Sequence, residues 1–119
     1  MPIRKLEKGQ EFQTVSVGQT VVGASTVLIE ETRDDVFCDD LYGYTTGDQA
    51  GDLVVVLSGR LEGKRKRRTL IHEMLHAISE AYGLDLSERT VRCLEQGVEQ
   101  GFSGLGLLSD QESSIAQIR

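Results

Sequence analysis

The stretch TLIHEMLHAI, residues 69–78, contains the only two histidines of the chain and decides how the rest of the sequence is interpreted. From about residue 67 to 82, apolar side chains recur at helical spacing and fill one arc of a helical wheel. His72, Glu73 and His76 fall on the opposite, polar arc. The pattern therefore predicts an amphipathic helix that buries one side and turns its histidines toward a cleft or toward solvent.

The histidines form an H-E-x-x-H motif, with Glu73 directly after the first histidine. Side chains four positions apart in a helix differ by about 40° around the axis and one turn along it, so both imidazoles can bind one ion. Neutral imidazole suits Zn²⁺. Glu73 is placed to take a proton from water at the metal. The motif thus predicts one zinc ion held by His72 and His76, with Glu73 as general base. The alternative is a chance spacing of ordinary histidines.

Two histidines leave such an ion short of a third protein ligand, and carboxylates on a second helix are the main candidates. Asp85 or Ser87 is expected to cap this helix, which runs to about residue 100. Glu95 borders its apolar arc, formed by Val91, Leu94 and Val98, so we expect Glu95 to face the first helix and bind the ion.

Two further glutamates share the stripe of Glu95. Glu99, one turn beyond, is a candidate to orient His72 or His76 through the free ring N–H. Glu88 is expected to lie farther toward solvent. For Glu88 and Glu99 the alternative is a solvated helix face paired with Arg92.

The first half of the chain has the composition of strands and turns. A tight hairpin with its turn at residues 18–19 is expected, followed by a β-branched strand over residues 25–30. Residues 41–46 form a short aromatic strand with Gly43 inside. The continuous apolar run Leu53–Leu57 is too short for a buried helix and predicts an inner strand.

These elements predict one α+β domain over residues 1–119. A small mixed or antiparallel sheet from residues 1–60 packs on the histidine helix and on the second, ligand-bearing helix, both within residues 65–102. Residues 103–119 are a tail with weak periodicity, either a short helix or a mobile end. A chain of 119 residues is long enough for one core and too short for two.

Charge and composition narrow the classes of partner. Lys and Arg total 13 against 19 Asp and Glu, for a net charge of −6, and five of the cations are consecutive at residues 64–68. An acidic protein with one short basic block is not expected to bind nucleic acid over a broad face. Three interpretations of the block are open. It is a solvated loop, it favours acidic substrates, or it binds the acidic tail around Asp110.

No apolar run is long enough to span a bilayer, and the first residues lack the apolar segment of a secretory signal. Cys38 and Cys93 cannot form a disulfide framework and are interpreted as reduced, buried side chains. We therefore expect a cytoplasmic protein of a bacterium or of a phage-infected host, without membrane association.

With Glu95 lying 19 residues after His76, the motif resembles that of the gluzincins of the thermolysin type. The small size resembles the minigluzincins and related small phage and prophage metallopeptidases, and the resemblance covers about residues 41–101. It implies that His72, His76 and Glu95 bind zinc, and that Glu73 is the general base and acid.

The resemblance also implies an edge strand that pairs with an extended substrate. Residues 41–46 are the candidate, including Tyr42, Gly43 and Tyr44, with Leu53–Leu57 inside them. Gly43 either allows close backbone approach or marks a bulge. The chain departs from the larger enzymes because no His or Tyr follows Glu95. The oxyanion would then depend on zinc, an arginine or one of the tyrosines Tyr42, Tyr44 and Tyr82. The resemblance further suggests that the C-terminal tail covers the cleft.

The expected function is therefore that of a zinc-dependent endopeptidase acting on a peptide or protein substrate. Two alternatives remain. The first is a weakly active or inactive zincin-like protein of phage or prophage origin that binds peptides as a regulator. The second is a small α+β interaction module that binds no metal.

Overall fold

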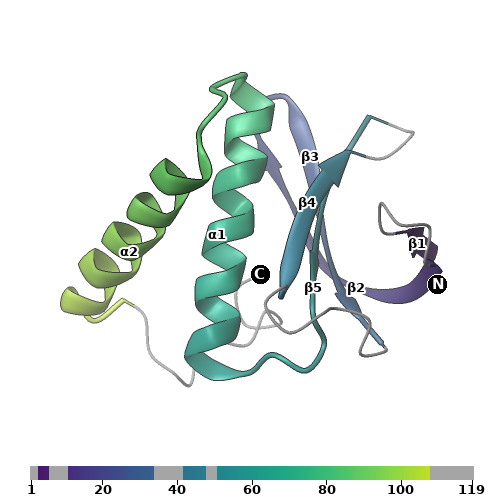
Figure 1. The fold of residues 1–119 in the computed structure, drawn as a ribbon, viewed down its shortest axis with the longest axis horizontal. Helices are drawn as coiled ribbons and strands as arrows, with labels where there is room; N and C mark the ends of the chain where they lie inside the picture. The colour runs from purple at the N-terminus through teal and green to yellow at the C-terminus, as the bar shows by residue number, and fades with distance from the viewer. Residues whose placement is uncertain (1–2, 6–10, 34–41, 48–50, 108–119) are drawn as a thin grey trace.

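The structure is a computed structural model that describes residues 3–5, 11–33, 42–47 and 51–107, with side chains from Phe12 onward. The described residues form an α+β fold of five strands and two helices, which confirms the expected class (Figure 1). In chain order these are β1 (Ile3–Lys5), β2 (Glu11–Val22), β3 (Ser25–Thr32), β4 (Gly43–Gly47), β5 (Leu53–Leu57), α1 (Gly63–Tyr82) and α2 (Glu88–Gly104).

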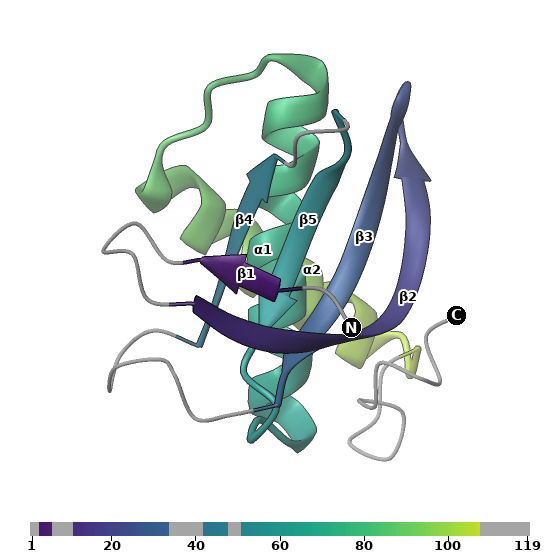
Figure 2. The same ribbon diagram turned by 90° about the vertical axis from the view of Figure 1, so that its right-hand side faces the viewer.

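The strands form one mixed sheet in the order β1-β2-β3-β5-β4. β3 and β5 pair in parallel, whereas the other neighbours are antiparallel. β4 therefore lies at the edge and β5 inside it, as the sequence predicts. Figure 2 shows β1 and the start of β2 crossing the face of the sheet that points away from the helices.

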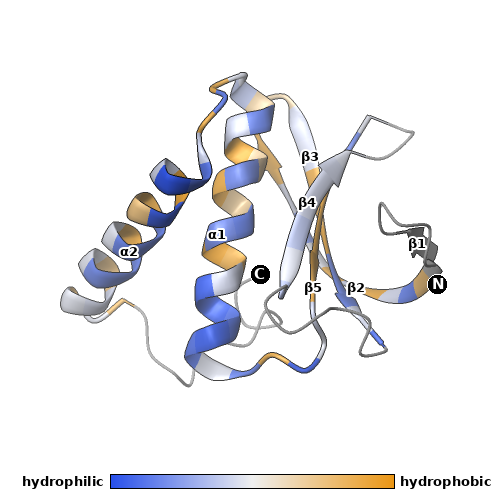
Figure 3. Cartoon of the chain, viewed as in Figure 1, coloured by the Kyte–Doolittle hydropathy of each residue, from blue (hydrophilic) through white to orange (hydrophobic). Residues whose placement is uncertain are grey.

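Both faces of β5 are buried, which explains its uninterrupted apolar sequence (Figure 3). Leu53, Val55 and Leu57 belong to the core that the sheet shares with α1, where Leu70 and Ala77 are also buried. The intervening residues, Val54 and Val56, pack with Phe12 on the opposite face. Because side chains alternate across a strand, this single run supplies both cores and fixes α1 against the sheet.

The expected turn at residues 18–19 is wrong. β2 continues through both residues, and its pairing with β3 shifts register between Ser16 and Gly18, as at a β-bulge. The turn lies instead at Gly23 and Ala24, where Gly23 has φ of 60°. Gly18 thus accommodates an irregularity inside a strand, and Gly23 supplies the positive φ that a two-residue hairpin turn requires.

The helices begin and end close to their expected positions. α1 starts one turn earlier than expected, and it ends at Gly83 in the left-handed conformation. The basic block at residues 64–68 therefore lies in the first two turns of the helix, and the expectation of a loop there is wrong. Ser87 caps α2, with its hydroxyl accepting a hydrogen bond from the N–H of Thr90 at 3.1 Å. Neither helix of the described chain combines the length and apolar content that a membrane span requires.

The inner face of α2 is smaller than expected. Val91 is fully buried, but Leu94 and Phe102 are exposed. Cys93, expected to be buried, is exposed with a free thiol. The predictions for Leu41, Cys38 and the tail beyond residue 107 lie outside the described residues.

Candidate metal centre

The two histidines project from the same side of α1, one turn apart. Their rings meet edge to face, with centroids 5.0 Å apart and planes inclined by 66°. Both line a groove of about 1150 Å³ between β4, α1 and the start of α2. The expectation that the histidines face a cleft is therefore met.

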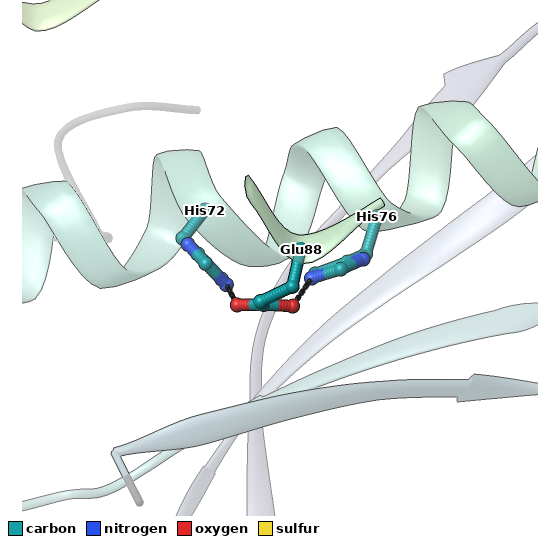
Figure 4. A group of neighbouring side chains, drawn as sticks. All are labelled: His72, His76 and Glu88. Carbon is teal, nitrogen blue, oxygen red and sulfur yellow. Dashed lines mark hydrogen bonds and ion pairs between the residues drawn. The ribbon is translucent and has the colours of Figure 1, made fainter. Parts of the chain in front are cut away.

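A single carboxylate joins the two rings. Oε1 of Glu88 lies 2.7 Å from Nε2 of His72, and Oε2 of the same side chain lies 3.0 Å from Nε2 of His76 (Figure 4). Because Ser87 is the cap, Glu88 is the first residue of α2, at the end of that helix nearest the histidines. One potential ligand atom from each of these three residues lies within 4.8 Å of the other two.

This arrangement differs from the expectation that Glu95 is the third ligand. Oε1 of Glu95 lies 2.7 Å from Nδ1 of His72, on the opposite side of the ring from Glu88. Glu95 therefore holds the ring in orientation, the role that the sequence suggested for Glu99. The structure places Glu88, expected toward solvent, at the two Nε2 atoms.

Glu99 contacts neither histidine and is only 6% exposed. Its carboxylate lies 3.4 Å from Nη2 of the buried Arg67 and 3.1 Å from Nε of Arg68, whose side chain is 44% exposed. Both expectations for Glu99, orientation of a histidine and a solvated face, are wrong in this arrangement. The alternative for Glu88 is partly met, because Arg92 Nε lies 3.6 Å from its Oε1 while Glu88 also bonds the histidines.

Glu73 points toward the edge strand and is only 7% exposed. Oγ1 of Thr45 lies 2.9 Å from its Oε1 and 2.8 Å from its backbone oxygen. Burial raises the pKa of the Glu73 carboxyl, while the hydrogen bond from Thr45 and the nearby histidines oppose this shift. Thr45 was not foreseen as a site residue, and the only sequence signal was its place in the expected edge strand.

The carboxyl of Glu88 is shifted in the opposite direction. Its partial desolvation favours the neutral form, but the electrostatic attraction of His72 and His76 and their hydrogen bonds outweigh this effect and lower the pKa of Glu88. An ionised carboxylate facing two imidazole nitrogens is a donor set suited to a divalent cation.

Tyr42, Gly43 and Tyr44, proposed for the substrate strand, occupy different environments in the structure. Tyr42 lines the groove, with the guanidinium of Arg65 5.2 Å above its ring. Gly43 is buried, and a Cβ there would lie 2.8 Å from the backbone oxygen of Val56. Its pairing with β5 is regular, so Gly43 allows close approach of backbones and is not a bulge. Tyr44 lines the groove and also packs edge to face on Phe12.

These positions narrow the candidates for oxyanion stabilisation. Tyr42 lines the groove, as do the arginines Arg65, Arg68 and Arg92. The ring of Tyr44 packs with Phe12 and Val56 on the sheet face opposite α1, so Tyr44 is a poor candidate. Tyr82 is exposed at the end of α1 and is not among the groove residues.

We expect Glu73→Gln to stabilise the metal-free protein at neutral pH. A carboxyl with a raised folded-state pKa stabilises the fold most below its unfolded value of about 4.3, and this contribution is lost as pH rises through the folded pKa. Glutamine stays neutral and still accepts from Thr45. Urea unfolding in the presence of a chelator should show the advantage of the variant growing from pH 4 to pH 7. An advantage independent of pH would contradict this explanation.

Comparison of the chain with protein-family models, with curated proteins and with solved structures gave no match.

Proposed function

We propose that this protein is a zinc-dependent endopeptidase, in which His72, His76 and Glu88 bind the metal and Glu73 is the general base and acid. The observation that carries the proposal is the convergence of two Nε2 atoms and one carboxylate beside the edge-strand groove. A compartment with a reducing environment, such as the cytoplasm, is part of the proposal and is supported by the free thiol of Cys93.

The three side chains suit zinc because of their ligand chemistry and because Glu88 is free to move to the required distance. Two imidazoles and one glutamate are a known ligand set of catalytic zinc sites. Donor atoms at tetrahedral zinc, with bonds of about 2.0–2.1 Å, lie roughly 3.3 Å apart. The contacts of Glu88 with the rings are shorter, at 2.7 and 3.0 Å, so its carboxylate would withdraw by a few tenths of an ångström. Its side chain is 52% exposed and has room to do so.

The proposed reaction divides the work among the residues of the groove. When bound, Zn²⁺ would act as a Lewis acid that polarises the scissile carbonyl and acidifies water. Glu73 accepts the proton of the attacking water and delivers it to the leaving amine. Glu95 holds His72 by its Nδ1 atom and so keeps Nε2 directed at the metal. The edge of β4 offers backbone groups with which an extended substrate can pair.

The decisive experiment measures metal content and proteolysis together. Protein purified without a histidine tag should contain one zinc per chain, and it should cleave casein in a reaction that a chelator stops and added zinc restores. Protein without bound metal would contradict the metal site itself and support an interaction module.

A second candidate is a zincin-like protein that binds peptides without cleaving them. The burial of Glu73 favours this candidate, since its carboxylate is held by Thr45 and has little exposed area. Bound zinc together with no cleavage of any unfolded substrate would support it over the peptidase.

We expect Thr45→Val to lower kcat about 10- to 100-fold with little change in KM, because the variant loses a hydrogen bond to the general base. That hydrogen bond lowers the pKa of Glu73, so its loss should move the acidic limb of the pH–rate profile to higher pH. Thr45→Ser should restore both. Thr46→Val, at an exposed neighbour, is the matched control. An equal effect of both valine variants would contradict a specific role for Thr45.

A further inference from the structure

We propose that the groove selects polypeptide segments with acidic side chains, which bind at the end of the groove formed by Tyr42, Lys64 and Arg65. This inference depends on the proposed function only for the cleavage that follows binding. It is carried by the distribution of charge along α1 and by the partners of each cation.

The groove is polarised along its length. Lys64 and Arg65 line it at the start of α1, whereas Glu80 and Asp85 line it near the other end of the helix. The histidines lie between these two charged ends. An extended chain in the groove therefore meets positive charge on one side of the metal centre and negative charge on the other.

The five consecutive cations differ in their partners. Lys66 lies 2.8 Å from Glu31, and Arg67 and Arg68 contact Glu99. Within the described part of the chain, Lys64 and Arg65 have no ion pair. Among the residues that the structure describes, the two cations of the block without a counter-ion are thus the two at the end of the groove.

Arg65 is also held in position. Its guanidinium lies 5.2 Å from the centroid of the Tyr42 ring, an arrangement that orients the cation at the start of β4. A side chain fixed beside the edge strand loses less conformational freedom when it binds a carboxylate than a mobile one does.

The dipole of α1 does not favour these two charges. Lys64 and Arg65 lie in the first turn of α1, which contains no acidic residue, and cations there oppose the helix dipole. Residues that break a local preference without a compensating ion pair are expected mainly at functional positions. The basic end of the groove is such a position.

The geometry also sets the distance between the acidic residue and the cleaved bond. Arg65 precedes His72 by seven residues, or about 10 Å at a rise of 1.5 Å per residue. An extended peptide covers that distance in about three residues. We therefore place the preferred acidic side chain two to four residues from the scissile bond, on the side toward Tyr42.

The test uses zinc-loaded protein carrying Glu73→Gln and three labelled peptides of otherwise identical sequence. At the same two positions, the first peptide has Glu, the second has Gln and the third has Lys. Fluorescence anisotropy should show the Glu peptide binding at least about fivefold more tightly than the Gln peptide and the Lys peptide binding most weakly. The difference should shrink at high salt. Arg65→Glu should reverse the order, and an acidic residue in the first turn is favourable for folding.

Arg89→Glu is the matched control, because Arg89 is exposed on α2 outside the groove and the variant changes the net charge equally. Equal binding of the three peptides, or equal effects of the two charge reversals, would overturn the inference. Tighter binding of a single-stranded oligonucleotide of similar length would overturn it in favour of nucleic acid. Cleavage is measured on the wild-type protein. Cleavage without any charge preference would refute the inference alone, whereas charge-selective binding with no cleavage by the wild-type protein would refute the peptidase alone.

Discussion

Glu73→Gln should abolish peptide hydrolysis, lowering kcat/KM by about 10³-fold or more, while the protein still binds one zinc ion. The amide is isosteric with the carboxylate and still accepts the hydrogen bond from Thr45, so the groove keeps its shape. The amide cannot accept a proton from water, and the general base is lost. Initial rates on casein, with metal analysis of the same preparation, measure both quantities.

The control for this variant is Glu80→Gln, which removes an exposed carboxylate from the same helix and the same groove. It should keep zinc and kcat, so that any effect of the lost groove charge on peptide binding appears in KM alone. A Glu73→Gln protein that retains a tenth or more of the wild-type rate would show that another group takes the proton. Loss of zinc from this variant would instead assign Glu73 to the metal.

Glu88→Gln should weaken zinc binding by about 10³-fold, because it removes the only charged residue from the proposed ligand set. The free energy of zinc binding at protein sites is on the order of 10 kcal/mol. Glu95→Gln should weaken it by only about 10- to 100-fold, as expected for a residue that orients a ligand through its second ring nitrogen. Titration with a competing chelator gives both dissociation constants. The comparison separates the two glutamates by the size of their effects.

His72→Ala and His76→Ala set the scale for loss of a ligand, and Glu80→Gln again serves as the unchanged reference. If Glu95→Gln costs more affinity than Glu88→Gln, Glu95 is the ligand, as the spacing of the sequence suggested. If none of these variants changes zinc binding, the metal lies elsewhere in the chain.

Local pattern was sufficient to predict much of the fold. The apolar arc before Gly83 predicted α1, and the run Leu53–Leu57 predicted an inner strand beside the edge strand. Both features follow from periodicity within one segment, so no tertiary information is needed. The hairpin turn was misplaced because two glycines, Gly18 and Gly23, compete for one role, and only the pairing of β2 with β3 decides between them.

The third residue of the candidate metal centre could not be predicted in the same way. Glu88 and Glu95 are seven residues apart, so they lie within about 20° of each other on a helical wheel. Which of the two glutamates lies beside the histidines depends on how far α2 is displaced along α1. That displacement is set by packing between the two helices, which the sequence pattern does not reveal. The burial of Glu99 likewise depends on its pairing with Arg67, a contact between residues 32 apart in sequence.

Among the described strands β4 is the outermost at one end of the sheet, and this position has a consequence for the behaviour of the protein in concentrated solution. Its outer backbone groups can pair with any extended chain, including another copy of the same strand, and long flat edges of this kind promote aggregation. β4 has only five residues, GYTTG, and glycine at both ends. Such a short edge offers few hydrogen bonds to a passing chain, so stable pairing requires additional contacts that a second copy of β4 alone does not provide.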